Sequence, residues 1–158
     1  MPRKKKKSTK QISYASYIVV ASSYSAEYSF GLGAECEPEP YSEYLYIKVQ
    51  GVLRITDSRK VSTGTQVKMS IQSDAGLMAK DFKPKAIAWL SLYEDALNLI
   101  ILLPPTGVQY MLSMLNSGKV DAFELHGTEL SRKKADINWF NVTTAFEWED
   151  WEETAAPY

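Results

Sequence analysis

Apolar and polar residues alternate along the first part of the chain. Between residues 11 and 32, nine of the eleven even-numbered positions are apolar or aromatic, against four of the eleven odd-numbered ones. A period of two on a background of tyrosine, valine and isoleucine predicts β-strand. This stretch exceeds the length of an ordinary strand, so we expect two strands with a bend or turn near residues 21–25.

The alternation returns after an acidic loop with two prolines at residues 33–40. The apolar residues that then share one parity are Leu45, Ile47, Val49, Leu53 and Ile55. Beyond the turn-rich residues 57–64, Val67, Met69 and Ile71 alternate with polar neighbours. Strands that are apolar on one parity face solvent on one side, so we expect a half-exposed antiparallel pair.

Residues 86–93 and 97–103 are apolar on both parities, with Glu94 and Asp95 between them. Periodicity alone does not separate such runs from a buried helix, but their short lengths and the two prolines that follow favour strands. We therefore expect a hairpin that is buried on both faces and carries the acidic pair at its tip. Residues 120–126 and 135–146 predict a last hairpin, joined by residues 127–134.

One helix is marked at about residues 106–117. Thr106 is placed to cap its first turn, and Gln109 follows three residues later, as a capping box requires. Residues 116–118, with the sequence Asn-Ser-Gly, supply the stop signal. The apolar stripe that we expect to face the core consists of Val108, Met111, Leu112 and Leu115.

Seven or eight strands and one helix predict a mainly β protein. Antiparallel strands in that number need a second layer, so we expect an antiparallel β-sandwich or a partly open barrel. The helix would plug an open end or cover an edge. We expect one β-rich domain at residues 11–146, a basic arm at residues 1–10 and an acidic aromatic tail at residues 147–158.

The net charge of -1 over 158 residues hides two opposed ends. Residues 1–10 hold six basic side chains and no acid, whereas residues 147–153 hold five acids and no base. Serines interrupt the apolar stretch after the basic start, so it makes a poor secretion signal. The longest strongly apolar run, residues 99–103, is too short to span a membrane. We expect a cytoplasmic protein in which Cys36 is reduced.

No arrangement of residues signals catalysis, and we predict that the protein is not an enzyme. His126 is the single histidine, and we interpret it as a satisfied strand-end or surface residue. Cys36 lies among glutamates, whose charge opposes formation of a thiolate nucleophile. A calcium-binding loop would need a different spacing, so we interpret four acids as a solvated loop: Glu35, Glu37, Glu39 and Glu43. We expect no metal and no cofactor.

Basic residues give the stronger indication of function, because flexible lysines release counterions when they meet phosphates. If the hairpin ends that carry these residues lie together, they form a cationic rim on the β body. The alternative is an ordinary solvated surface. The candidate polyanion-binding residues are Arg3, Lys4, Lys5, Lys6, Lys7, Lys10, Arg54, Arg59, Lys60, Arg132, Lys133 and Lys134. The candidates for stacking on bases are Tyr44, Tyr46, Trp89 and Trp139.

Aromatic and acidic side chains interleave in residues 146–153, and the last two residues are Pro157 and Tyr158. In this feature alone the tail resembles the acidic, aromatic-ended tails of single-stranded DNA-binding proteins, although aspartate dominates those tails and glutamate dominates here. The resemblance implies a tail that occupies the DNA groove or recruits partners through Trp148, Trp151 and Tyr158. The alternative is that residues 145–151 extend the last strand, with both tryptophans packed on a neighbour.

Two functions follow from these patterns. The first is a non-enzymatic binding module that engages a polyanion, with nucleic acid as the first candidate, through the basic arm and loops. Its acidic tail would compete with the ligand or recruit partners. The second is an oligomeric structural or adaptor protein that pairs through β-edges and charged arms, without nucleic acid. Residues 12–32 would expose such a pairing edge.

Overall fold

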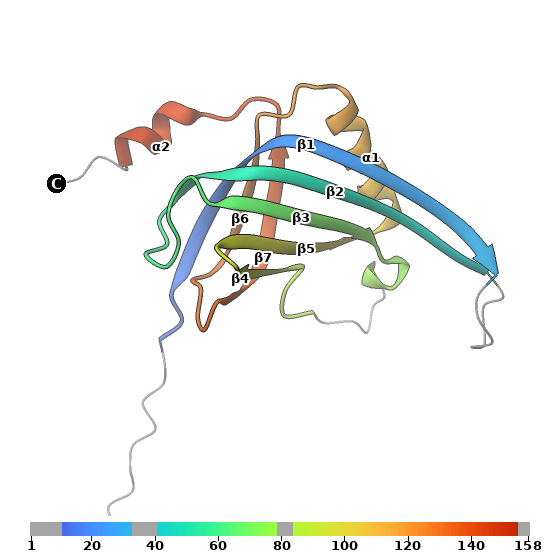
Figure 1. Cartoon of the computed structure of the whole chain (residues 1–158), viewed down its shortest axis with the longest axis horizontal. Helices are drawn as coiled ribbons and strands as arrows, with labels where there is room; N and C mark the ends of the chain where they lie inside the picture. The colour runs from blue at the N-terminus through green and yellow to red at the C-terminus, as the bar shows by residue number, and fades with distance from the viewer. Residues whose placement is uncertain (1–10, 33–40, 79–83, 155–158) are drawn as a thin grey trace, which may run out of the picture.

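Seven strands close into one barrel (Figure 1). The computed structural model describes residues 11–32, 41–78 and 84–154. The strand order around the barrel is β1-β2-β3-β5-β4-β7-β6, and β6 returns to β1. All neighbours are antiparallel except β3 and β5, which are parallel. The strands are β1 (Tyr14–Leu32), β2 (Tyr41–Thr56), β3 (Gln66–Ser73), β4 (Ala88–Tyr93), β5 (Ala96–Leu103), β6 (Ala122–Thr128) and β7 (Lys134–Thr143).

The prediction of a mainly β protein with about seven strands and one main helix is confirmed, and the sheet is a closed barrel. The main helix is α1 (Pro105–Asn116), and a 3-10 turn, η1, covers Ala75–Met78. A second helix, α2 (Trp148–Thr154), follows the barrel. The acidic pair Glu94 and Asp95 forms the tight turn between β4 and β5, as the sequence predicted.

The first strand differs from the prediction, because β1 is a single strand of 19 residues and not two. Its pairing with β2 shifts register between Ala21 and Ser23, so Ser22 is an extra residue in a β-bulge. The Ser22 hydroxyl donates a hydrogen bond of 3.1 Å to the carbonyl of Gln50. A bulge bends the strand at the predicted place without breaking the ladder. Opposite it, a Cβ on Gly51 would overlap the carbonyl oxygen of Val20, so only glycine fits there.

The barrel interior is the hydrophobic core, and α1 plugs one end of it. Side chains of every strand contribute, and Tyr17, Ile47 and Phe123 are among those fully buried. Three residues of the predicted stripe are buried in this core: Val108, Met111 and Leu115. Leu112, the fourth, is partly buried against it. The stripe prediction is therefore confirmed.

The predicted capping box of Thr106 and Gln109 is wrong. The N-cap residue is Pro104, no side chain caps the helix, and Pro105 occupies its first turn. Proline suits that position because its fixed φ is already helical and its missing N–H would have no partner inside the helix.

The C-terminal segment also differs from the expected strand extension, because β7 ends at Thr143 and α2 follows. Phe146 is buried with Ile18 on the outside of the barrel, and Trp148 and Trp151 pack against this cluster. The rings of Phe146 and Trp148 meet edge to face at 4.4 Å. The two tryptophans are three residues apart and so share a helix face, which a strand would not allow. Packing of both on a neighbour is confirmed, but through a helix.

Candidate polyanion-binding site

Three chain reversals meet at the barrel end away from α1, and we call this the basic end. They are the β2–β3 loop (residues 57–65), the β4–β5 turn (residues 94–95) and the β6–β7 turn (residues 129–133). One hollow of about 500 Å3 here is lined by Arg59, Lys60 and Leu92 among others. An adjoining hollow of about 380 Å3 is lined by Lys60 and Leu92 again, together with Arg132 and Lys133. Two of the predicted basic pairs therefore lie side by side.

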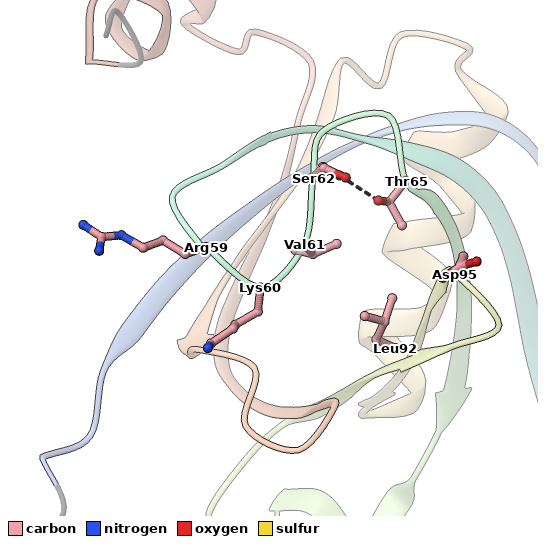
Figure 2. A pocket seen from close by; sticks show the side chains of 7 residues that line it. All are labelled: Arg59, Lys60, Val61, Ser62, Thr65, Leu92 and Asp95. Carbon is pink, nitrogen blue, oxygen red and sulfur yellow. Dashed lines mark hydrogen bonds between the residues drawn. The ribbon is translucent and has the colours of Figure 1, made fainter. Parts of the chain in front are cut away.

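Arg59 and Lys60 reach the larger hollow from the β2–β3 loop, and Leu92 and Asp95 reach it from β4 and the β4–β5 turn (Figure 2). Lys60 and Leu92 belong to both hollows, whereas the guanidinium of Arg59 extends outward. Asp95 is the single acid among the residues that line the two hollows, against four basic residues. The lining of the hollows is therefore net positive, although the three reversals also carry Asp57, Glu94 and Glu129 outside that lining.

Hydrogen bonds tie the β2–β3 loop to the β6–β7 turn and to the start of the described chain. The backbone N–H of Arg59 donates to the Glu129 carboxylate at 3.1 Å, which joins the β2–β3 loop to the β6–β7 turn. The N–H of Lys60 donates to the buried hydroxyl of Ser58 at 3.2 Å. The N–H of Glu129 donates to the carbonyl of Ser13 at 2.9 Å, so the first described residues lie at the same end. The residues of the basic arm, Arg3, Lys4, Lys5, Lys6, Lys7 and Lys10, lie outside the described residues and precede this point in the chain.

Both tight turns at the basic end place two non-glycine residues in the left-handed region. The φ angles are 51° and 65° at Arg132 and Lys133, and 48° and 60° at Glu94 and Asp95. Two-residue turns of this kind are normally built from Asn-Gly or Asp-Gly, because other residues are strained at positive φ. Each strained residue costs roughly 1–2 kcal/mol. The charged side chains are therefore held at positions that local conformation disfavours.

Other predicted residues are divided between this end and the rest of the barrel. Lys134 begins β7 beside the turn and is exposed. Arg54 instead lines a separate hollow of about 580 Å3 with Ser22 and Trp148, beside α2. This hollow brings one predicted basic residue next to the acidic C-terminal helix, whose first turn holds Glu149 and Asp150.

The stacking candidates lie in two places. Trp89 and Trp139 are 43% and 48% exposed on the outside of the barrel, on β4 and β7. Tyr44 and Tyr46 lie at the opposite end of β2 from the basic end. Ten residues separate Tyr46 from Thr56, which is about 33 Å of strand, so the structure does not bring the two tyrosines to the basic loops.

Tyr93 was missed by the sequence analysis. It is 66% exposed and directly precedes the β4–β5 turn, next to Leu92 of the two hollows. Its position before the predicted acidic tip was the available signal. Successive side chains of a strand point to opposite faces, so the Tyr93 ring lies on the outer face of β4 and not in the hollows that Leu92 lines.

His126 contacts side chains of two neighbouring strands. Its Nδ1 lies 2.8 Å from the hydroxyl of Ser16 across β1 and β6, and its ring lies 4.8 Å from that of Trp139. Tyr28 donates a hydrogen bond of 2.9 Å to Glu43, one acid of the predicted solvated loop. Cys36, Glu35, Glu37, Glu39 and Tyr158 lie outside the described residues. Among residues 11–32, 41–78 and 84–154, no three potential metal ligands gather in one place.

No family model matches the chain, and neither the comparison with curated proteins nor that with solved structures finds a match. Within the part of the chain that the structure describes, neither α1 nor α2 has the length and apolar character needed to cross a bilayer.

Proposed function

We propose that the protein is a binding module for a polyanion, with nucleic acid as the first candidate, and that the basic end is the contact surface. The observation that carries this proposal is the meeting of Arg59 and Lys60 with Arg132 and Lys133 around two adjoining hollows. The described chain begins at the same end, where the carbonyl of Ser13 accepts a hydrogen bond from the N–H of Glu129. We infer that the six basic side chains of the arm add their charge to that of the four in the loops.

The strained turn at Arg132 and Lys133 supports the same proposal. Asn-Gly would adopt this turn at lower cost, so the fold does not require Arg132 and Lys133 there; the acidic turn at Glu94 and Asp95 is strained in the same way. Tyr93 offers an exposed ring for stacking on the outer face of the barrel at the same end. In this arrangement the basic loop residues bind phosphates, and the basic arm adds affinity that does not depend on the nucleotide sequence.

The C-terminal helix is the internal competitor in this proposal. Its Trp148 and Trp151 pack with Phe146 on the outside of the barrel and bring its acids to the side that holds Arg54. Fixed acids near a cationic surface lower its potential, and binding of a polyanion would have to overcome that field.

The test is titration of labelled single- and double-stranded oligonucleotides at several salt concentrations. Four phosphate contacts at the loops alone give a slope of log K against log salt of about -3 to -4, and the arm steepens it. Arg59→Gln with Lys60→Gln should weaken binding about tenfold at low salt. The matched control, Lys48→Gln with Lys119→Gln, removes the same charge from exposed sites away from the hollows and should change binding less than about twofold. Binding that stays flat with salt, or equal losses in both variants, would reject the proposal.

A second candidate function is the structural or adaptor role, in which copies of the chain pair through their sheet edges. The observation that favours it is the outer part of β1, which pairs with β2 on one edge and, among the described residues, with no strand on the other, because β6 pairs with β1 only over Tyr14–Val19. This role needs no polyanion, and it is separable from the first by the oligomeric state at low salt.

A further inference from the structure

The outer face of β4 carries two large aromatic side chains. Ala88 and Leu90 are buried in the core, so Trp89 and Tyr93 point away from it. Trp89 pairs with Ile100 of β5, and the two side chains are 43% and 45% exposed. An indole ring is therefore open to solvent on the outside of the barrel, beside an aliphatic neighbour.

A row of polar side chains crosses the barrel next to Trp89. Ser91 pairs with Lys134 of β7 on one side and with Asn98 of β5 on the other. Asn98 in turn pairs with Lys68 of β3. Each of the four has a core residue next to it in its own strand, so all four side chains point outward. The row thus holds a hydroxyl and an amide between two ammonium groups, and such groups contact base edges and phosphates in nucleic-acid complexes.

The same face continues into the basic end. The N–H of Leu92 donates a hydrogen bond of 2.9 Å to the carbonyl of Lys133, so the end of β4, with Tyr93, lies beside the β6–β7 turn. In the other direction, Trp139 lies on β7 about 10 Å along from the residue that pairs with Trp89. Three exposed rings therefore follow β4 and β7 away from the basic turn, with polar side chains between them.

Few charges accompany these rings. At the outward positions of β3, β4, β5 and β7 the bases are Lys68 and Lys134, and the single acid is Asp136, which pairs with Trp89. The acidic β4–β5 turn lies beyond this face, at the basic end. A polyanion would make most of its charge contacts at the basic end, so the rings are the feature of this face that adds affinity.

The elements that could enter the groove of a duplex carry no basic side chain. The major groove of DNA admits a helix or a two-stranded ribbon. Among the described residues these elements are α1, α2 and the end of the β1–β2 hairpin, residues 22–32 and 41–45, which projects past α1 (Figure 1). α1 has no charged residue, and the charged residues of α2 and of the hairpin end are all acids. Phosphates repel these elements, so the described fold is unsuited to reading a duplex.

We propose that the polyanion is a single-stranded nucleic acid whose bases stack on Trp89 and on the neighbouring rings of Tyr93 and Trp139, with phosphates at Lys134 and Lys68. The inference rests on the proposed function, because the basic end supplies most of the charge. Bases of a single strand are free to stack on aromatic side chains, whereas those of a duplex are already stacked on each other. Phosphate contacts are common to DNA and RNA, so either strand fits this face.

The test is titration of the full chain at low salt with four labelled probes of equal length. They are a single DNA strand, a single RNA strand, a DNA duplex and an abasic DNA strand, which keeps the phosphates and lacks the bases. The DNA or the RNA single strand should bind at least about fivefold more tightly than the abasic strand, because one stacked base contributes that much affinity. It should also bind more tightly than the duplex.

Variants at Trp89 separate stacking from a structural role. Trp89→Leu should weaken binding of the single strand at least about fivefold and leave binding of the abasic strand unchanged. Trp89→Phe keeps a ring and should recover most of the loss. Tyr110→Leu is the matched control, because this ring is 75% exposed on α1, at the other end of the barrel, and its loss should change binding less than about twofold. Circular dichroism and the urea midpoint check that the variants fold.

Three results would overturn this inference and leave the basic end as a polyanion site. They are equal affinity for the single strand and the abasic strand, tighter binding of the duplex, and equal losses in Trp89→Leu and Tyr110→Leu. Failure of the proposed function has a different signature, since no probe would then bind in a salt-dependent way, and this inference would fall with it.

Discussion

Gly127 lies directly against the backbone of Asp136, so closely that a Cβ at Gly127 would overlap the Asp136 carbonyl oxygen. The same Cβ would stand 2.8 Å from the Cα of Ile137. The pairing of β6 with β7 shifts register between His126 and Gly127, so the glycine is the residue that lets the strands approach at this bulge. The bulge lies a few residues before the β6–β7 turn that carries Arg132 and Lys133.

Gly127→Ala should therefore destabilise the barrel by at least about 2 kcal/mol, because the backbone of β7 must move away. Urea denaturation followed by circular dichroism measures this loss. Gly31→Ala is the control, since nothing lies within 4 Å of a Cβ at that position. Equal stability of the two variants would contradict the close approach.

The two strained turns allow stability and binding to be separated. Replacing Arg132 and Lys133 by Asn and Gly should stabilise the fold by about 1 kcal/mol or more, because both positions have positive φ. The same change should weaken oligonucleotide binding. Replacing Glu94 and Asp95 by Asn and Gly should stabilise to a similar extent, and it should leave binding equal or stronger.

Thermal denaturation and salt-dependent titration of the two turn variants give both readouts. A loss of affinity in both variants would show that the rigidity of the barrel end, and not the charge of Arg132 and Lys133, controls binding.

Stability should fall at alkaline pH because of Tyr17. Burial raises the pKa of Tyr17 from 10.0 to about 12, and its hydroxyl donates a hydrogen bond of 3.1 Å to the Thr128 carbonyl. The folded state thus holds this proton more tightly than the unfolded state does. Tyr17 therefore contributes its full stabilisation of the fold below about pH 10. As the pH rises toward 12 this stabilisation is lost, at about 1.4 kcal/mol of unfolding free energy per pH unit.

Denaturant titrations of the wild type and of Tyr17→Phe at pH 8, 10 and 11 measure the pH-dependent contribution of Tyr17 to the free energy of unfolding. The wild type should lose free energy of unfolding above pH 10 relative to the variant. A constant difference between the two proteins across this range would contradict the assignment.

The tail can be tested without removing its packing residues. A chain that ends at Trp151 keeps Phe146, Trp148 and Trp151 of the external cluster and loses Glu152 and Glu153. If the acids oppose a polyanion, affinity for an oligonucleotide should rise about threefold at low salt and less at high salt. The urea midpoint reports on the packing and should change little. An unchanged affinity would remove Glu152 and Glu153 from the proposed competition and leave Glu149 and Asp150 of the first turn.

Much of the fold follows from periodicity, because alternation of apolar residues is a direct consequence of strand geometry. The stripe of α1 is visible for the same reason. The two-strand interpretation of β1 was wrong because alternation does not reveal that Ser22 is absorbed as a bulge opposite Gly51. The capping box was wrong because Pro105 already starts the helix one residue before Thr106.

The candidate site was harder to predict than the strands. Arg59 and Lys60 lie more than 70 residues from Arg132 and Lys133, and only the strand order brings them together. That order depends on the parallel pairing of β3 with β5, which local sequence does not encode. Tyr44 and Tyr46 were grouped with the basic loops by residue type alone, and the length of β2 separates them.

The closing strands of the barrel are also the last ones to be synthesised. Until β6 and β7 are made, β1 and β4 each lack a neighbour on one side. A growing chain therefore exposes two open strand edges, which pair only when the β6–β7 hairpin joins the sheet. About 40 residues separate the end of β5 from the end of β7, which takes roughly 2–8 s at ordinary rates of translation. During that interval the nascent chain carries the apolar lining of its first five strands in an open sheet, and a chaperone that shields such sheets should bind it then and release it once the hairpin docks.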